Sequence, residues 1–285
     1  MISALVVSHD SAEDLPACLA SLDAQATQDE HELEVIVVDT ASEDGSLRLL
    51  RTDHPSVQLV ELESNVGFGA ACNLGVRQAR GDSLLLLNPD ARLGDGALAA
   101  MAARLAEAPD LAAVAPRLVS PSGRSQHGWS PDRSLIGEAV QRLRNPIQGS
   151  WLDRGPVESL LRRVMGPGWF SAACLLLRRE AFESVGGFDQ GYFLYFEDAD
   201  LCVRLRRAGW RLAEVPSATA VNAGRAGQSR SPWLEAVYRR SQIRYYRKHR
   251  PRWERTVLRR YLRMIHGAAE VERWIARNLG AHYPW

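Results

Sequence analysis

Residues 34–43 read EVIVVDTASE, and this stretch decides the fold class. Residues 34–38 form an almost continuous β-branched run, which predicts a strand that is buried on both faces. The run ends at Asp39, and residues 40–43 then have the Thr-x-x-Glu spacing of a capping box. A buried strand followed at once by a helix start is typical of α/β proteins with a parallel sheet.

The same rhythm extends on both sides of this stretch through the first 120 residues. Short apolar runs alternate with segments of helical periodicity, which predicts right-handed βαβ units. Sheets of this kind bind ligands at the carboxyl ends of their strands. The predicted strands are 2–7, 34–38, 57–62, 83–87 and 112–118, and the predicted helices are 12–24, 46–52, 68–79 and 96–106.

Residues 120–168 interrupt this rhythm, because glycine and proline recur there with little periodicity. An irregular insert of this length is either a functional lid or a poorly ordered linker. Regular patterning returns at 169–177 and continues through the acidic motif to 212–215, and residues 233–279 predict two helices separated at Pro251. We therefore expect one domain over 1–230, which contains the insert, and a helical extension over 231–285.

Composition fits a soluble globular protein: 46% of the 285 residues are hydrophobic and 24% are charged. No apolar run approaches the roughly 20 residues of a membrane span. The opening MISALVVSHD has no basic region, so it predicts a first strand and not a signal peptide. The widely spaced cysteines predict buried free thiols in a reducing cytoplasm; they are Cys18, Cys72, Cys174 and Cys202.

Charge is unevenly distributed along the chain. The first 100 residues carry a net charge of −12, which argues against nucleic-acid binding there, whereas residues 231–285 carry +9. The basic extension has two interpretations. It either contacts an anionic lipid surface or a lipid diphosphate, or it is a packed helical hairpin whose basic face is solvated or forms an oligomer contact.

Polar residues follow three of the predicted strands. A carboxylate at Asp39 can accept a base N–H or a ribose hydroxyl. The turn Asn65–Gly69, with Asn73 beyond it, lets backbone N–H groups approach a phosphate. Asn88-Pro89-Asp90 is an oxygen-rich turn of the kind that holds a hard divalent cation. The plain alternatives are a capped strand-to-helix turn, a damaged dinucleotide fingerprint and a simple Asn-Pro-Asp turn.

Residues 187–206 read GFDQGYFLYFEDADLCVRLR and place three acids directly after an aromatic run. An acid set against aromatic side chains loses water, which raises its pKa and makes it a better base. Glu197, Asp198 and Asp200 are therefore candidate catalytic groups. The structural alternative is that they cap a helix and that Asp200 pairs with Arg204 one turn later.

Five segments occur here in one order: VVDTASEDGS, NVGFGAACNLGVRQARGD, LLLLNPD, FSAACLLLRREAFESVGGFD and YFLYFEDADLCVRLRRAGW. Together they resemble glycosyltransferase family 2, in its rhamnosyltransferase-like branch. The similarity covers residues 1–230, and RYYRKH at 244–249 is also similar. The resemblance implies a GT-A fold, an α/β architecture with a mostly parallel sheet flanked by helices.

The resemblance also implies an activity, which is inverting transfer of a sugar such as rhamnose from a nucleoside diphosphate to a cell-surface glycan or glycolipid. It implies Mg²⁺ or Mn²⁺ as cofactor and a cytoplasmic location, with contact at the inner face of the membrane. Residues 120–168 would lie on the acceptor side. The implied roles are nucleobase and ribose binding for Val7, Ser8 and Asp39; diphosphate-side binding for Asn65, Gly67, Phe68, Gly69, Asn73 and Asn88; metal binding for Asp90; and base catalysis for Asp198, with Glu197 as the alternative.

Two positions depart from the family pattern. Asn222 stands where the branch usually has a histidine near the metal, so only a neutral oxygen is offered there, and Cys72 replaces an asparagine. These departures support a second hypothesis, a nucleotide-sugar-binding module that has lost catalysis. A nucleotidyltransferase is disfavoured, because the segment SHDSAEDL after the first strand is acidic and has no glycine.

Overall fold

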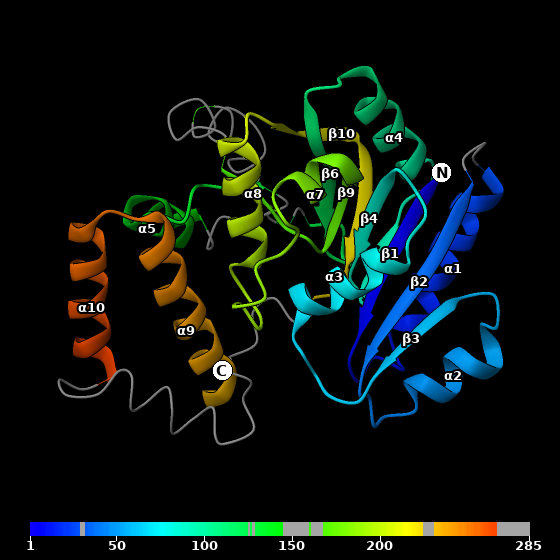
Figure 1. Cartoon of the computed structure of the whole chain (residues 1–285), viewed down its shortest axis with the longest axis horizontal. Helices are drawn as coiled ribbons and strands as arrows, with labels where there is room; N and C mark the ends of the chain where they lie inside the picture. The colour runs from blue at the N-terminus through cyan, green and yellow to red at the C-terminus, as the bar shows by residue number, and fades with distance from the viewer. Residues whose placement is uncertain are drawn as a thin grey trace.

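The computed structural model describes residues 1–28, 32–124, 126, 129–144, 160, 168–224 and 231–266. That part contains an eight-stranded sheet in the order β3-β2-β1-β4-β9-β6-β10-β5 and a small sheet of β7 and β8 (Figure 1). The strands are β1 Ile2–Ser8, β2 Leu33–Thr40, β3 Gln58–Leu62, β4 Ser83–Leu87, β5 Ala91–Leu93, β6 Leu111–Val119, β7 Trp129–Ser130, β8 Trp169–Phe170, β9 Cys174–Arg178 and β10 Arg211–Asn222. The helices are α1 Leu15–Gln28, α2 Ser46–Asp53, α3 Phe68–Gln78, α4 Ala97–Glu107, α5 Leu135–Arg144, α7 Arg179–Ser184, α8 Glu197–Arg207, α9 Pro232–His249 and α10 Arg252–His266.

The predicted α/β fold with a mostly parallel sheet is confirmed. Strands β3, β2, β1 and β4 run parallel, so their carboxyl ends share one edge. Strand β9 runs antiparallel to β4 and β6, and β5 runs antiparallel to β10. The parallel half of the sheet therefore gathers the segments that follow β1, β2 and β4 on one side of the molecule.

The regularly patterned segments after the insert contain strands. Residues 169–177 hold β8 and most of β9, and at the bend between these strands the N–H of Asn88 donates to the carbonyl of Ala173 at 2.9 Å. Strand β10 includes residues 212–215 and continues to Asn222, because the ladder breaks only locally, around Pro216, which has no N–H to donate. The short elements β5, β7, α5 and α7 were not predicted.

Side chains alternate across the sheet and divide the core into two faces. Val6 packs in the cluster that includes residues of α1, α2 and α4, whereas Leu5 packs in the cluster that includes residues of α3, α7 and α8. All four cysteines are buried free thiols, as expected. Among the described residues, no helix is long and apolar enough to cross a membrane.

Helices α9 and α10 pack against α8 through a third apolar cluster. Tyr192 and Phe196 precede α8, and they meet Tyr245 of α9 and Leu258 of α10 in this cluster. Helix α8 thus lies between the sheet and the C-terminal helices (Figure 1). The two predicted C-terminal helices are present and separate at Pro251.

Some predictions fall outside the described residues. They concern most of the 120–168 insert (125, 127–128, 145–159 and 161–167), the domain boundary near 230 (225–230) and the end of the last helix (from 267).

Candidate functional site

The carboxyl ends of β1 and β2 bring two candidate residues side by side. Ser8 and Asp39 are register partners in the β1–β2 ladder, and both are fully buried. Asp39 accepts hydrogen bonds from the backbone N–H of Ser42 at 2.9 Å and from its hydroxyl at 2.6 Å. The hydroxyl of Ser8 has no hydrogen-bond partner within the described chain. Val7, one residue earlier, is half-buried.

The glycine turn before α3 packs against the segment that leads to α8. Asn65 closes the turn by accepting from the N–H of Gly67 at 3.0 Å, and Phe68 donates its N–H to the carbonyl of Phe193 at 3.0 Å. Gly67 has φ +85°, and a Cβ there would lie 2.3 Å from that carbonyl oxygen. Only glycine fits this close approach, which holds the turn against residues 188–196.

Asn73 and Gly69 extend the same contact along α3. The amide of Asn73 donates to the carbonyl of Phe188 at 2.8 Å and accepts from its N–H at 2.9 Å. A Cβ on Gly69 would lie 2.9 Å from the Cβ of Phe188 and 3.7 Å from that of Glu197. The turn therefore lies beside the start of α8, and the amide of Asn73 positions that segment. A diphosphate contact by Asn73 stays a prediction.

The turn after β4 brings the candidate metal ligands close in the fold. The N–H of Ala223 donates to the carbonyl of Asp90 at 2.9 Å, and Asn222 pairs with Ala91 between β10 and β5. The side-chain oxygen of Asn222 accepts from the N–H of Gly224 at 3.1 Å. Asn88 and Asp90 are half-buried. Among the described residues, no three His, Cys, Asp or Glu side chains are grouped as a metal site.

The aromatic run ends in an unusual backbone conformation directly before the acids. Tyr195 and Phe196 have φ of 69° and 68°, a left-handed conformation that is rare for bulky residues and is retained where packing enforces it. Helix α8 starts immediately afterwards with Glu197 and Asp198. Glu197 is only 6% exposed, and its Oε2 has no hydrogen-bond partner among the described atoms. Asp198 is half-buried and accepts from the N–H of Ala199 at 2.8 Å.

Both carboxyl groups have raised pKa values. Burial raises the pKa of Glu197, and the neighbouring charge of Asp198 adds to the effect. Burial also raises the pKa of Asp198, against the opposing charge of Arg133 and the N–H groups of Ala199 and Ala172. Two neighbouring carboxyl groups that are largely removed from water are suited to hold one proton and one negative charge.

Arg133 is a residue that the sequence interpretation missed. Its guanidinium stacks 4.4 Å from the ring centre of Trp169 and 4.8 Å from that of Phe196. Its charge favours the ionised forms of Glu197 and Asp198. Arg133 lies in the irregular insert, where no periodicity marks a side chain as facing a site, so the sequence carried no signal for it.

The third acid, Asp200, has a different environment. Its side chain is fully buried and contacts three nitrogen donors: Arg204 Nε at 2.6 Å, Lys248 Nζ at 2.7 Å and His249 Nε2 at 2.6 Å. Although burial alone would raise it, the hydrogen bonds from His249 and Lys248 and the charge of Arg204 hold the pKa of Asp200 well below its usual range. The predicted pair with Arg204 is confirmed. The N-cap residue Phe196 makes no side-chain cap hydrogen bond, and among the acids Asp198 accepts the first-turn N–H of Ala199.

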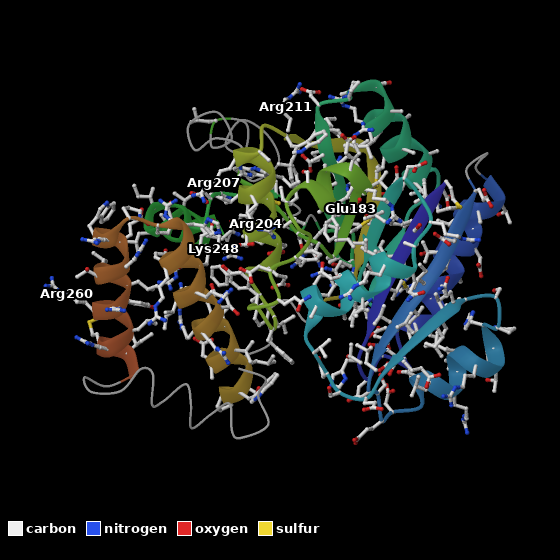
Figure 2. All side chains as sticks on the ribbon, viewed as in Figure 1. Glu183, Arg204, Arg207, Arg211, Lys248 and Arg260 are labelled. Atoms are coloured by element: carbon white, nitrogen blue, oxygen red, sulfur yellow. The ribbon has the colours of Figure 1, made fainter. Side chains whose placement is uncertain are left out.

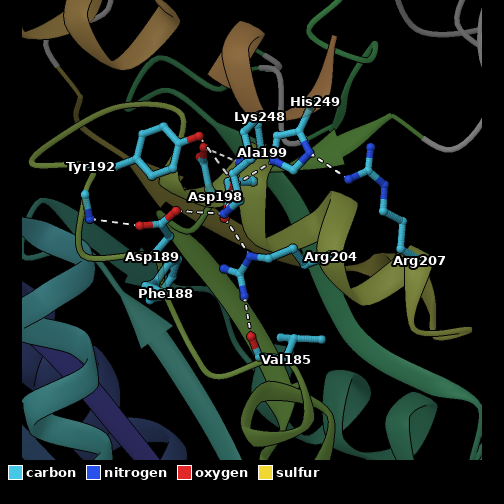
Figure 3. A network of polar contacts seen from close by, with 12 residues as sticks. Val185, Phe188, Asp189, Tyr192, Asp198, Ala199, Arg204, Arg207, Lys248 and His249 are labelled. Atoms are coloured by element: carbon cyan, nitrogen blue, oxygen red, sulfur yellow. Dashed lines mark hydrogen bonds and ion pairs between the residues drawn. The ribbon is translucent and has the colours of Figure 1, made fainter. Parts of the chain in front are cut away.

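This network fixes the helix that carries the catalytic candidates (Figure 3). Arg207 lies 3.1 Å from Nδ1 of His249, and as its guanidinium can only donate, Nε2 carries the hydrogen that is donated to Asp200. Lys248 also contacts Asp189 at 2.7 Å. Helix α9 is thereby bound to both ends of the segment from 189 to 200.

Two contacts connect the acids at the start of α8 with neighbouring candidate positions. Glu197 lies beside Gly69, and Asp198 receives the N–H of Ala172, whose neighbour Ala173 binds Asn88 at the end of β4. The acids at the start of α8 therefore lie near the edge formed by the ends of β1, β2 and β4. Such an arrangement can bind a polar ligand along the sheet edge and remove a proton from a second reactant.

Comparisons with known sequences agree on one family. The sequence model described as Glycosyl transferase family 2 matches residues 3–186. N-acetylglucosaminyl-diphospho-decaprenol L-rhamnosyltransferase of Mycobacterium tuberculosis (strain ATCC 25618 / H37Rv) is 30% identical over 277 residues, which cover 92% of this chain and 89% of that protein. Rhamnosyltransferase WbbL of Escherichia coli (strain K12) is 30% identical over 231 residues, which cover 78% of this chain and 83% of that one.

Comparisons with solved structures show a shared fold. Mannosyltransferase PcManGT from Pyrobaculum calidifontis, in complex with GDP-Man and Mn²⁺, has a TM-score of 0.58 at 20% identity and covers 97% of this chain and 73% of that one. S. aureus TarS 1–349 in complex with UDP has a TM-score of 0.53 at 17% identity and covers 93% and 70% of the two chains.

Proposed function

The chain belongs to glycosyl transferase family 2, and from that premise we propose that it is an inverting enzyme that transfers a sugar from a nucleoside diphosphate to a hydroxyl of a lipid-linked or glycan acceptor. The names of the mycobacterial and E. coli relatives support rhamnose as the sugar. The observation that carries the proposal is the desolvated pair Glu197 and Asp198 beside the carboxyl ends of the parallel strands.

Asp198 is the proposed base. The acceptor hydroxyl must lose its proton as its oxygen attacks the anomeric carbon, so a single carboxylate near the bond-forming atoms is sufficient. Asp198 is the more accessible of the two acids, whereas Glu197 is nearly enclosed. A protonated Glu197 carries no charge, so Asp198 can be ionised beside it without like-charge repulsion. No second nucleophilic carboxylate is needed, unlike in retaining glycosidases.

The donor would lie along the edge of the sheet. Val7, Ser8 and Asp39 are proposed to hold the base and ribose, and the buried, unpartnered hydroxyl of Ser8 supports a ligand there. The turn from Asn65 to Gly69, together with Asn73 and Asn88, is proposed to face the diphosphate. Since Gly67 and Asn73 already bind the segment before α8, the donor and the base would be positioned together.

The oxygen ligands near the end of β4 fit a divalent cation. Asp90 offers one carboxylate and Asn222 one neutral oxygen, and Mg²⁺ is commonly held by one or two carboxylates together with substrate phosphates. The Mn²⁺ in the complex of PcManGT supports this class of metal. When bound, Mg²⁺ or Mn²⁺ would neutralise the charge that develops on the departing diphosphate.

Peripheral membrane contact through α10 is also proposed. Trp253, Val257 and Met264 expose apolar side chains at spacings that place them on one face of the helix. Arg260 and Arg263 lie next to this stripe, and Figure 2 shows Arg260 on the outer side of α10. Apolar residues flanked by arginine are typical of helices that lie on anionic membranes. The alternative is a solvated face or a contact between copies of the chain.

A thermal-shift screen tests the proposed function. Nucleoside diphosphates and nucleotide sugars are added with and without Mg²⁺ or Mn²⁺, and a ligand at about 100 times its Kd should stabilise the native state by about 2.7 kcal/mol. We expect at least one nucleotide sugar to raise the Tm, and to raise it further with metal. If no nucleotide raises the Tm, the proposal is wrong. If donors bind but no nucleoside diphosphate is released with any acceptor or metal, the binding module without catalysis is supported.

A further inference from the structure

The guanidinium of Arg133 lies beside the acids and stacks on two aromatic side chains. Its ring contacts with Trp169 and Phe196 fix the plane of the group, and its Nε is buried with no hydrogen-bond partner in the described part of the chain. A planar guanidinium has five N–H donors in a fork that matches phosphate oxygens. Stacking on two aromatic rings orients this fork before any ligand arrives.

A basic cavity lies between α8 and α9, and Asp132, the residue before Arg133, is part of its lining. It has a volume of about 260 Å³, and its lining includes Arg206, Arg207, His249 and Arg250 with Asp132 as the single acid. Asp132 is already bound to Arg250 at 2.7 Å and to the hydroxyl of Tyr245 at 3.0 Å. Arg206 and Arg207 therefore leave the cavity with positive charge that no carboxylate in its lining neutralises.

Two pairs of neighbouring residues connect the surroundings of Arg133 with this cavity. Arg133 follows Asp132 in sequence and stacks on Trp169, and Arg206 donates to the carbonyl of the adjacent Gly168. Along α8, Asp198 and Arg206 are eight positions apart, which corresponds to about 12 Å of helix. A hexose ring and the phosphates attached to it can span this distance. We call Arg133, Arg206 and Arg207 the arginine track.

Arginines in the last turn of a helix often donate hydrogen bonds to its free carbonyls, but in α8 backbone N–H groups already do so. The N–H of Ala208 donates to the carbonyls of Arg204 and Leu205, and the N–H of Gly209 donates to that of Arg206. Arg206 and Arg207 direct their guanidinium groups to Gly168 and His249 instead. The two guanidinium groups therefore line the cavity and do not cap the end of α8.

We propose that the arginine track is a subsite for the phosphates that join an acceptor sugar to its lipid. The inference rests on the proposed function, since the acceptor hydroxyl must lie at Asp198 for the phosphates to reach the track. The base acts on the acceptor, so cations that extend away from Asp198 and from the donor edge of the sheet meet the acceptor and not the leaving diphosphate.

Direct binding tests the subsite without requiring turnover. Calorimetry would compare farnesyl diphosphate with farnesol, which lacks only the diphosphate, on the full chain. We expect farnesyl diphosphate to bind, and Arg133→Gln or Arg207→Gln each to weaken its binding about tenfold, the value of one charge-assisted hydrogen bond. Arg51→Gln is the matched control, because Arg51 is an exposed residue of α2 that pairs with Glu61, and it should keep the wild-type Kd. Arg207 is exposed, so its variant is expected to fold even if Arg133→Gln does not.

Several results would overturn the inference. The variants could retain the wild-type Kd, or farnesol could bind as tightly as farnesyl diphosphate. Inorganic diphosphate binding as tightly as farnesyl diphosphate would assign the track to a free anion and not to a lipid-linked acceptor.

Kinetics then separate this inference from the proposed function. The ratio of kcat/KM for a sugar diphosphoryl lipid to that for the neutral alkyl glycoside should fall about tenfold in Arg207→Gln. Arg51→Gln should keep the wild-type ratio. An unchanged ratio in Arg207→Gln, with active wild type, contradicts the subsite alone. Absence of transfer by the wild type to either acceptor contradicts the proposed function, while the calorimetric result still decides the subsite.

Discussion

Replacement of Asp200 by asparagine should destabilise the fold strongly. The side chain is fully buried, and its loss leaves Arg204, Lys248 and the 2% exposed His249 without their shared carboxylate. Removing one partner of a buried ion pair costs about 3–5 kcal/mol. Lys248 retains Asp189 and Arg204 retains the carbonyl of Val185 at 2.7 Å, so we expect about 3 kcal/mol. For a chain of this size, that lowers the Tm by roughly 6–12 °C.

Urea unfolding of Asp200→Asn beside Asp110→Asn measures this effect. Asp110 pairs with Arg211 at 2.6 Å, but both side chains are at least half exposed, so the control should lose no more than about 1 kcal/mol. The pKa of Asp200 is lowered by folding, so its stabilisation is present at neutral pH and is lost as the pH falls through the lowered value. The difference in unfolding free energy between wild type and Asp200→Asn should therefore decrease below about pH 4. If Asp200→Asn loses as little unfolding free energy at pH 7 as Asp110→Asn does, the reasoning is refuted.

Three further predictions address the site. Because burial raises the pKa of Asp198, kcat/KM for transfer should begin to fall, as the pH is lowered, at a pH well above the ordinary carboxyl pKa of about 4. A kcat/KM that stays constant down to about pH 4 would contradict a raised pKa in the base. Gly67→Ala should lose more than about 2 kcal/mol of unfolding free energy through its clash with Phe193, whereas Gly45→Ala, at φ +98° with open space, should lose only about 1–2 kcal/mol; equal losses would show that the contact is unimportant. Asp90→Asn should abolish the extra thermal shift that Mn²⁺ adds to a nucleotide sugar, and an undiminished shift would place the metal elsewhere.

The sequence predicted features that depend on local patterning. Apolar runs such as 83–87 located the strands because a buried strand needs little beyond continuous hydrophobicity. The pairing of Asp200 with Arg204 was predictable because the two lie one helical turn apart. The order of β9 in the sheet was not predictable, since its antiparallel pairing depends on a bend at 171–173 that only tertiary contacts explain.

Long-range contacts supplied the rest of the site. His249 follows Asp200 by 49 positions, and nothing in either local pattern links the two. Arg133 is meaningful only when Trp169 and Phe196 close around it. Asn73 was interpreted as a ligand-binding residue, and the structure gives both ends of its amide to the backbone of Phe188. A short polar side chain near a glycine turn has both uses, and sequence alone does not separate them.

Sugar transfer by Asp198→Asn, beside Glu197→Gln, tests the central claim most directly. Loss of the base should reduce kcat by about 10²–10⁴-fold while donor affinity is retained. Folding raises the pKa of Asp198, so its ionised form costs stability at neutral pH, and the neutral variant should be at least as stable as wild type. A folded Asp198→Asn protein with wild-type turnover would contradict the account, and loss of transfer only in Glu197→Gln would assign the base to Glu197.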